Sequence, residues 1–450
     1  MRDSGAIPPV GRDGTVRDDE VVEIARELIR VDTTNGNETA AAEVIARRLA
    51  EVPEIRCEIV ARDPKRGNLV ARLPGRGDGP TVALVGHLDV VPADARDWTH
   101  PPFAADVDDD GYLFGRGALD MKNEVAARTA IMLRLAREGF QPSGDILLVM
   151  VADEEDGSAE VGMNWLVDAH PDKIRCDVAI NEGSGRFYPL SDGRVVAEIS
   201  VGEKGTQPVR VDALGEAGHA STPSIGASAV PRLAELLRRI GVGMPTPARH
   251  DVVDEMLRVL SGPHGDRDLA EAIEHARQLH PSFEHTLPAV CGTTMAPTRL
   301  FGSRARNVIP ARAAVELDCR VLPGTTPDDV AAQVRERLGD DVAYELSFPE
   351  PMIEGNYSAP RGALWDAIDG WLETLGDPAP TLLPSLDTGF TDSVYLRNAF
   401  DCVAYGFSPL RSTPPEIAEA GYHAKDERVH IDDLVLSVDF HDFVLRRLLG

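Results

Sequence analysis

The chain has 450 residues, more than one typical hydrophobic core holds, so two domains are expected. Its 74 acidic and 46 basic residues give a formal net charge of −28, which argues against nucleic acid or an anionic membrane as a partner. The residues up to 18 are polar and lack an apolar signal-peptide core, and the longest strongly apolar run, 146–152, is too short to cross a bilayer.

The cysteines are few and scattered. They are never arranged as CxxC, which argues against a disulfide framework and against a thiolate zinc site. Such usage indicates a reducing compartment, and we expect a soluble, cytoplasmic protein. The five positions are Cys57, Cys176, Cys291, Cys319 and Cys402.

The first part of the chain alternates strands with helices. Apolar residues at helical spacing predict helices over 19–30, 38–50, 121–138 and 159–168. Strand-like runs lie at 58–60, 68–72, 81–90, 145–152 and 177–180. This alternation predicts an α/β layered fold with a largely parallel sheet.

The pattern changes near residue 199. Two helices, 227–240 and 327–338, alternate with strands at 198–213, 293–299, 311–320 and 342–348, in the β-α-β-β-α-β order of a ferredoxin-like unit. Residues 244–290 form a helical excursion inside it. From about 350 the α/β character returns and ends in a helix over 432–449. We therefore predict a catalytic domain in two segments, 1–198 (1–18 as a flexible arm) and 350–450, interrupted by an inserted domain over 199–349.

His87 and Asp89 lie at the end of the apolar strand predicted over 81–90. Residues two apart on a strand share a face, so an imidazole and a carboxylate would lie side by side. A histidine oriented by a carboxylate is common at metal sites. A structural histidine that meets an aspartate is the alternative.

Further candidate ligands follow other strands. Glu154 and Glu155 come after the strand at 145–152, and Glu182 comes after the strand at 177–180. The carboxyl ends of parallel strands share one edge of a sheet, so these groups should converge on His87. Asp120 precedes a helix and is either a ligand or an N-cap, and His423 lies in the loop before the last helix. The acidic turn at 154–156 has the alternative of capping the next helix.

Taken in order, these motifs resemble the M20 family of metallopeptidases and aminoacylases, which includes carboxypeptidase G2-like enzymes, desuccinylases and N-acyl amino acid deacylases. The resemblance covers nearly the whole chain. It rests on Gly86-His-Leu-Asp-Val-Val-Pro92, Gly115-Arg-Gly-Ala-Leu-Asp-Met-Lys122, Ala152-Asp-Glu-Glu155, Asn181-Glu-Gly183, Gly218-His-Ala-Ser-Thr-Pro223, Asn307-Val-Ile-Pro310, Asp318-Cys-Arg-Val-Leu-Pro-Gly324, Thr388-Gly-Phe-Thr-Asp392 and His423.

The resemblance implies a binuclear-metal exopeptidase-type catalytic domain and an inserted lid and dimerisation domain. Asp120 would bridge two divalent ions, usually zinc, with cobalt or manganese as substitutes. One ion would also take His87 and Glu182, and the other Glu155 and His423. Asp89 would fix the tautomer of His87, and the peptide bond after Asp120 would be cis.

The resemblance also implies catalytic and substrate-binding roles. Glu154 would be the general base, and His219, often supplied by the partner subunit of a homodimer, would stabilise the oxyanion. The positions that match substrate contacts are Asn307, Arg320, Thr388 and Gly389. An arginine on a strand is, however, more often part of an ion pair, which is the alternative for Arg320.

The chain departs from the family pattern in three places. Lys122-Asn123 replaces the usual Gly-Gly, the loop at 388–392 reads Thr-Gly-Phe-Thr-Asp rather than Gly-Gly-Thr-Asp, and the excursion at 244–290 enlarges the inserted domain. The second change obscures the substrate, and the third puts the usual dimer interface in question.

The sequence thus predicts a zinc-dependent amidohydrolase that acts on a small peptide or an N-acyl amino acid with a free carboxylate. A carboxypeptidase or dipeptidase and an N-acyl amino acid deacylase both remain open. A non-catalytic, metal-binding or regulatory homologue is the alternative, against which the intact Glu154 argues. A bimetallic phosphoesterase lacks support because no phosphate cradle accompanies the site.

Overall fold

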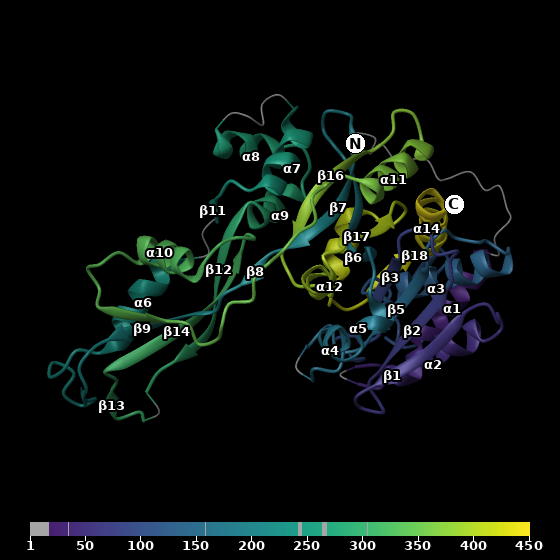
Figure 1. Ribbon diagram of the computed structural model, residues 1–450. Helices are drawn as coiled ribbons and strands as arrows, with labels where there is room; N and C mark the ends of the chain where they lie inside the picture. The colour runs from purple at the N-terminus through teal and green to yellow at the C-terminus, as the bar shows by residue number, and fades with distance from the viewer. Residues whose placement is uncertain (1–17, 35, 158, 242–244, 263–267, 304) are drawn as a thin grey trace. The chain divides into compact units, whose positions relative to one another are not determined.

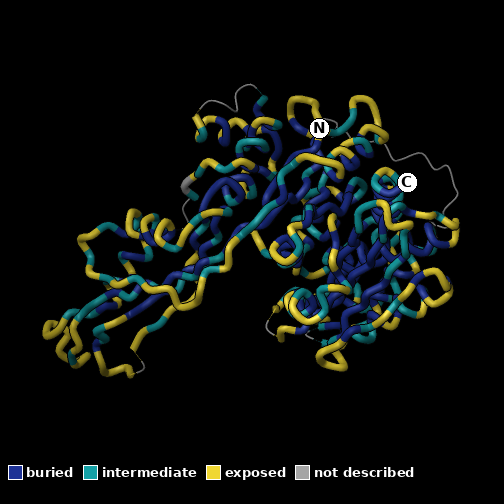
Figure 2. The backbone as a smooth tube through the Cα atoms, in the orientation of Figure 1, coloured by how far each residue is buried: buried dark blue, intermediate teal, exposed yellow. Residues whose placement is uncertain are grey.

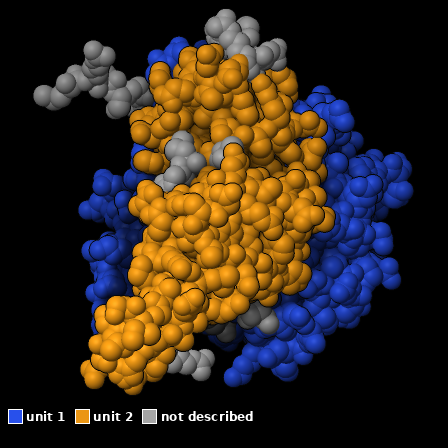
Figure 3. All heavy atoms as spheres, turned by 90° about the vertical axis from the view of Figure 1, so that its left-hand side faces the viewer, with its two compact units in different colours: residues 1–202, 358–385, 391–450 blue, residues 203–357, 386–390 orange. Residues whose placement is uncertain are grey.

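The computed structural model (Figure 1) describes residues 18–34, 36–157, 159–241, 245–262, 268–303 and 305–450. The chain divides into two compact units, which Figure 3 colours separately. Unit 1 comprises 1–202, 358–385 and 391–450, and unit 2 comprises 203–357 and 386–390. The arm predicted at the N-terminus lies outside the described residues, up to the start of helix α1 at Asp18.

An eight-stranded sheet forms the centre of unit 1, in the order β1-β2-β5-β3-β6-β17-β7-β16. The four adjacent strands β5, β3, β6 and β17 are mutually parallel, whereas β1–β2, β2–β5 and β7–β17 are antiparallel pairs. The prediction of a largely parallel sheet therefore holds for the middle of the sheet and not for the pairings of β1, β2 and β7. The strands are β1 Arg56–Ala61, β2 Gly67–Leu73, β3 Val82–His87, β5 Ile146–Val151, β6 Val178–Pro189, β7 Val195–Glu203, β16 Thr381–Asp387 and β17 Val403–Leu410, with a separate pair β4 Tyr112–Phe114 and β18 Arg428–His430.

Helices cover both faces of this sheet. Helix α3 (Lys122–Arg137) packs on β3 and β5 and also contacts α1 (Asp18–Ile29) and α14 (Ile431–Leu449), so it is buried along almost its whole length (Figure 2). On the other face, α4 (Met163–Ala169) and α12 (Ser393–Phe400) share an apolar core with alternate residues of the parallel strands. Strands covered on both faces are apolar at nearly every position, as β3 and β5 are. The remaining helices are α2 Glu38–Leu49, α5 Pro171–Ile174, α11 Ala363–Leu372 with the 3-10 turn η2 Glu373–Leu375, and α13 Pro415–Gly421.

Unit 2 is built on an antiparallel sheet in the order β11-β12-β14-β9-β15. The elements β9, α6, β12, β14, α10 and β15 follow one another in the predicted β-α-β-β-α-β order, and the apolar faces of α6 and α10 pack on the sheet. The α/β fold class is confirmed. Bounds are β8 Gly205–Thr206, β9 Val209–Leu214, β10 Gly218–His219, α6 Ala229–Ile240, β11 Thr246–Pro247, β12 Gly292–Phe301, β13 Val308–Ile309, β14 Arg312–Val321, α10 Pro327–Leu338 and β15 Tyr344–Ser347.

The predicted excursion contains helices α7 (Asp251–Ser261), α8 (Leu269–Arg277) and α9 (Phe283–Val290), which pack on one another. Two details differ from the expectation. The boundaries between the units along the chain fall at 202/203 and 357/358 rather than at 198/199 and 349/350. The short segment 386–390 also belongs to unit 2. Among the described residues, no helix combines the length and apolar character that a membrane crossing needs.

Candidate metal centre

Three parallel strands of unit 1 bring their carboxyl ends to one edge of the sheet. His87 pairs with Val151, the last residue of β5, and Leu84 pairs with Ile180 of β6. Glu154 and Glu155 lie in the turn after β5, and Glu182 lies two residues past the last β3–β6 pair. The strand register alone therefore gathers an imidazole and several carboxylates in one place.

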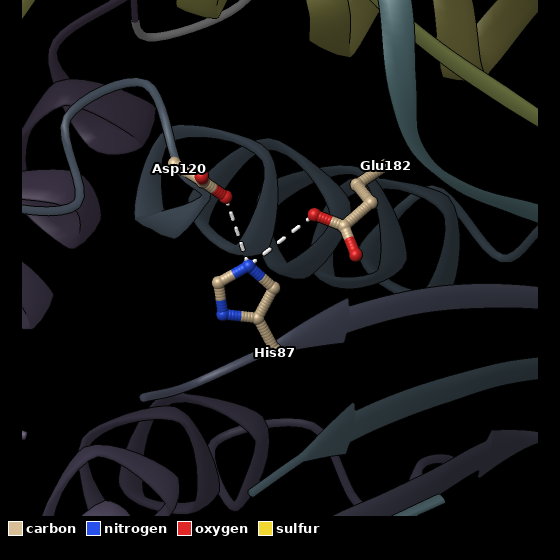
Figure 4. Close-up of side chains that lie close together, drawn as sticks. All are labelled: His87, Asp120 and Glu182. Carbon is tan, nitrogen blue, oxygen red and sulfur yellow. Dashed lines mark hydrogen bonds and ion pairs between the residues drawn. The ribbon is translucent and has the colours of Figure 1, made fainter. Parts of the chain in front are cut away.

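One group of candidate ligands surrounds the ring of His87. Its Nε2 lies 3.0 Å from Asp120 Oδ1 and 3.3 Å from Glu182 Oε2 (Figure 4). The ligand atoms of these three residues all lie within 4.8 Å of one another. We call this group the strand triad, because His87 and Glu182 are held by β3 and β6.

A second group shares Asp120. His423 Nε2 lies 3.2 Å from Asp120 Oδ2, the other oxygen of that carboxylate, and 3.0 Å from Glu155 Oε2. We call Asp120, Glu155 and His423 the loop triad, because all three lie between regular elements.

The sequence offered helix capping as an alternative role for Asp120 and for the acidic turn at 154–156, and neither caps a helix here. Helix α3 begins at Lys122 without a side-chain cap, and α4 begins at Met163 with Gly162 as its uncapped N-cap.

The tautomer of His87 is fixed by a backbone group rather than by the predicted side chain. Its Nδ1 lies 3.0 Å from the carbonyl oxygen of Asp89 and 3.8 Å from the Asp89 carboxylate. The carboxylate instead accepts the backbone N–H groups of Glu154 (3.2 Å) and Glu155 (3.0 Å). Asp89 thus holds His87 through its main chain and the Glu154–Glu155 turn through its side chain.

The charges of the two triads are strongly coupled. Burial opposes a charge on His87, but the carboxylates of Glu182 and Asp120 raise its pKa well above the usual value. Hydrogen bonds with Asp120 and Glu155 raise the pKa of His423 to about 10. Burial would raise the pKa of Asp120, but its hydrogen bonds with His423 and His87 lower it overall. Each imidazole is therefore placed where a positive charge is strongly favoured.

The donor set fits divalent cations. A carbonyl oxygen only accepts, so Nδ1 of His87 carries a proton, and Nε2 faces two carboxylate oxygens. This second contact is attractive only when a proton or a metal cation lies between Nε2 and the carboxylates, and a divalent cation can take the place of that proton. Within the described part of the chain, Glu155 Oε1 and Glu182 Oε1 are also buried without a hydrogen-bond partner. Imidazoles and carboxylates without a thiolate are the ligands of a catalytic divalent ion with open positions.

Comparison with known proteins decides the family. Residues 83–447 match the model of peptidase family M20/M25/M40. The chain belongs to this family. It is 37% identical over 433 residues to a succinyl-diaminopimelate desuccinylase from Parvibaculum lavamentivorans, covering 94% of each chain. It is 28% identical over 437 residues to aminoacylase-1 from Mus musculus, covering 95% of each.

Solved structures show the same fold. An M20 family metallo-carboxypeptidase from Sulfolobus solfataricus matches with a TM-score of 0.67 at 17% identity, over 96% of this chain and 99% of the other. A dinuclear metal binding M20 peptidase from Bacillus subtilis matches with a TM-score of 0.60 at 14% identity, over 96% and 98%. Family membership together with the two triads supports metal-dependent amide hydrolysis, and no comparison favours a non-catalytic homologue.

Glu154 lies beside the triads of this M20 protein without belonging to either. Burial and the nearby carboxylate of Glu182 raise its pKa well above the usual value. A raised pKa makes the carboxylate a stronger base, which favours a role in general acid–base catalysis.

The loops of Asp120 and His423 are tied together by a buried ion pair that sequence reasoning missed. Glu427 accepts the backbone N–H groups of Gly117 (3.2 Å), Leu119 (2.7 Å) and Asp120 (3.0 Å) and pairs with Arg116 at 2.5 Å. Arg116 also donates to the carbonyl of His423 at 3.2 Å. His423 has a φ of 57°, in the left-handed region that non-glycine residues seldom adopt. The only sequence signal was a glutamate four residues after His423.

A further carboxylate was quoted in a motif but given no role. Asp392 is 5% exposed, and burial followed by the carboxylate of Glu182 raises its pKa well above the usual value. It therefore adds negative charge near the strand triad. The Asp120–Met121 peptide bond is cis, as the resemblance implied.

The remaining predicted site residues lie in unit 2. His219 pairs with Val308, and the Asn307 carbonyl accepts the Ala220 N–H at 3.0 Å, so His219 and Asn307 are close neighbours. The fork of Arg320 is occupied by Asp318, with contacts of 2.7 and 3.2 Å. This is the ion-pair alternative for Arg320. Thr388 and Gly389 are exposed.

Proposed function

We propose that this chain hydrolyses the amide bond of a small peptide or an N-acyl amino acid that carries a free carboxylate. The observation that carries the proposal is one carboxylate, Asp120, shared by two ligand triads, with Glu154 beside them and outside both. The names of the similar proteins, a desuccinylase, an aminoacylase and a carboxypeptidase, support this substrate class without choosing between its two members.

Asp120 would bridge two divalent ions, the first also held by His87 and Glu182 and the second by Glu155 and His423. Bound there, the ions would polarise the scissile carbonyl and lower the pKa of the attacking water. We propose Zn²⁺, since imidazole and carboxylate ligands suit it, and such sites also accept cobalt or manganese.

Glu154 would move the proton. Its carboxylate would take a proton from the attacking water and return it to the leaving amine nitrogen. The backbone of Glu154 is anchored by the Asp89 carboxylate, so this base is held on a fixed turn. Burial disfavours the charged form of Glu154, which makes its carboxylate a stronger base.

His219 would donate a hydrogen bond to the oxyanion. Its Nδ1 accepts the backbone N–H of Ser221 at 3.2 Å, so the neutral ring carries its proton on Nε2. That nitrogen is the available donor of an exposed side chain. Asn307, its neighbour, would contact the substrate, as would Thr388 and Gly389. Arg320 would bind a substrate carboxylate only by exchanging it for Asp318.

Two wider assignments remain predictions. Dimerisation through unit 2 is supported by β12, which pairs along its length with β14 but on its other side only at Gly292 and Thr293 among the described residues. Such an edge, with Leu300 67% exposed, can pair with a second copy. All five cysteines are free thiols, as a cytoplasmic location predicts.

The decisive experiment replaces Glu154 by glutamine. We expect hydrolysis of dipeptides or of N-acetyl, N-succinyl or long-chain N-acyl amino acids to fall by roughly 10²–10⁴-fold, while two divalent ions remain bound by elemental analysis. Asp156→Asn, in the same turn but exposed, is the matched control and should keep its activity. Full activity of the E154Q protein, or fewer than two ions in the wild type, would refute the proposal.

A further inference from the structure

A buried arginine behind the strand triad has no role in the chemistry described so far. Arg128 lies on α3, is fully buried, and is the largest such side chain among the described residues. Its guanidinium donates to the carbonyl oxygens of Val85, on β3, and of Asn181, on β6, the latter at 2.9 Å. One side chain thus bridges the two strands that carry His87 and Glu182.

The bridge begins where the strand pairing stops. β3 and β6 are paired at Val82–Val178, Ala83–Ala179 and Leu84–Ile180, and no further. Val85 and Asn181 are the next residues of the two strands. Beyond the last backbone pair, β3 and β6 are therefore joined by the guanidinium, which binds one carbonyl of each strand. Val85 stands two residues before His87, and Asn181 one residue before Glu182.

The charge of Arg128 is balanced by a network between α3 and α14. Glu124 Oε2 lies 3.5 Å from the guanidinium and accepts a hydrogen bond from the Ser437 hydroxyl at 2.9 Å. His441 Nε2 accepts from Arg128 Nε at 3.4 Å, and its Nδ1 donates to the Ser437 carbonyl at 2.7 Å. All four residues are buried. The guanidinium is thus held by Glu124 and His441 as well as by the carbonyl groups of the two strands.

A buried ion pair is weak evidence for stability alone, because apolar residues of similar volume often stabilise a core as well or better. Here Arg128 does what an apolar residue cannot, since separate N–H groups of its planar guanidinium donate to backbone carbonyls on two neighbouring strands. Its positive charge also lies near the Glu182 carboxylate. Within the described residues, Arg128 forms no hydrogen bond or ion pair with Glu155 or His423.

We propose that Arg128, held by Glu124, is a positioning residue that sets the spacing of His87 and Glu182 and so tunes the metal affinity of the strand triad selectively. The inference rests on the metal sites of the proposed function. Support around a ligand typically changes metal affinity by 10–100-fold. The loop triad, which has its own anchors in Asp89 and Glu427, should be affected far less.

The test is a cobalt titration of the full chain, in which equilibrium dialysis counts the ions and visible absorption reports their geometry. The double variant R128M/E124Q leaves no unpaired buried charge. We expect it to lose roughly 10–100-fold in affinity at one site and to keep the other within about 3-fold of wild type. Adding His423→Ala, which removes a loop-triad ligand, should abolish the binding that remains.

Arg134→Met, on the same helix but near the surface, is the matched control and should leave both affinities unchanged. Equal weakening at both sites, or none, would overturn the proposal, whatever the melting temperature does. If the double variant does not fold, R128K decides, because lysine keeps the charge but lacks the fork. Wild-type affinity at both sites of R128K would then overturn the proposal. Fewer than two ions in wild type would instead count against the proposed function.

Discussion

The two triads share Asp120 but are built in different ways. The imidazole of His87 is 1% exposed and leaves the end of a strand covered on both faces, whereas that of His423 is 55% exposed and lies in a loop. The strand triad is positioned by sheet register and by Arg128 behind it. The loop triad is positioned by single side chains that bind backbone groups, namely Asp89 and the Arg116–Glu427 pair. The strand triad is thus positioned by the packed sheet, whereas the loop triad depends on a few buried carboxylates.

Asp120 belongs to both triads, so replacing the residue that anchors its backbone should give the largest effect. Glu427→Gln leaves the buried Arg116 without a charged partner and weakens the hold on Gly117, Leu119 and Asp120. We expect a loss of roughly 3–5 kcal/mol in the free energy of unfolding of the metal-free protein, measured with urea in the presence of a chelator. Both metal affinities should fall together, in contrast to the selective loss expected from Arg128.

The double variant E427Q/R116M is the control for this prediction. Removing both charges should recover part of the lost stability but not the metal affinity, because glutamine keeps only one of the two oxygens that accept the backbone N–H groups around Asp120. A stable E427Q protein with wild-type metal affinity would mean that the loop carrying Asp120 keeps its conformation without the Glu427 carboxylate.

The two histidines should differ in what they contribute without metal. His87→Ala leaves a cavity, removes the histidine partner of Glu182 and leaves Asp120 with His423 alone, so we expect a loss of roughly 2–5 kcal/mol in the free energy of unfolding of the metal-free protein. His423→Ala removes a half-exposed group and should cost less than about 1 kcal/mol. Each variant should lose one ion. Urea unfolding with a chelator measures the stability of the metal-free variants, and elemental analysis without the chelator counts their bound ions. Equal stability losses in the two variants would contradict the proposed difference between the triads.

Asp89→Asn tests which triad the Asp89 side chain serves. Because the Asp89 carbonyl, not its carboxylate, orients His87, the strand triad should keep its affinity. The loop triad should lose roughly 10–100-fold, since an asparagine side chain cannot accept both the Glu154 and Glu155 N–H groups through two oxygens. A cobalt titration resolves the two sites. Selective loss at the strand triad would instead restore the role that the resemblance implied for the carboxylate.

The same contrast explains what the sequence could predict. Apolar strands followed by His87, Glu155 and Glu182 were enough to expect convergence, because parallel strands end at a common edge. The supporting groups could not be predicted in this way. A histidine can bond to the carbonyl or to the carboxylate of the same Asp89, and only the backbone path decides which.

Strand β6 shows a second limit. Its apolar pattern ends at Ile180, yet the strand runs on to Pro189 through Gly183 and Gly185. A Cβ on Gly183 would meet Gly406 at 2.8 Å, and one on Gly185 would meet the Ser408 carbonyl at 1.9 Å. Close approach to β17, which the chain reveals only when folded, requires these glycines. The backbone groups that Arg128 and Glu427 bind likewise lie at least 43 residues away in the sequence.

The smallest predicted effect concerns the network behind the strand triad. Burial, and then the charge of Arg128, lower the pKa of His441 to about 3, so its ring is neutral in the folded protein at neutral pH. The unfolded chain takes up a proton at the usual histidine pKa, near 6.5. The contribution of His441 to stability is therefore complete above pH 6.5 and is lost as the pH falls from 6.5 towards 3, by about 1.4 kcal/mol per pH unit. His441→Gln can keep both hydrogen bonds, to Arg128 and to the Ser437 carbonyl, without titrating. Urea unfolding of the metal-free proteins at pH 7 and pH 5.5 should show a shallower loss for H441Q than for wild type, and parallel losses would show that the ring is already charged in the fold.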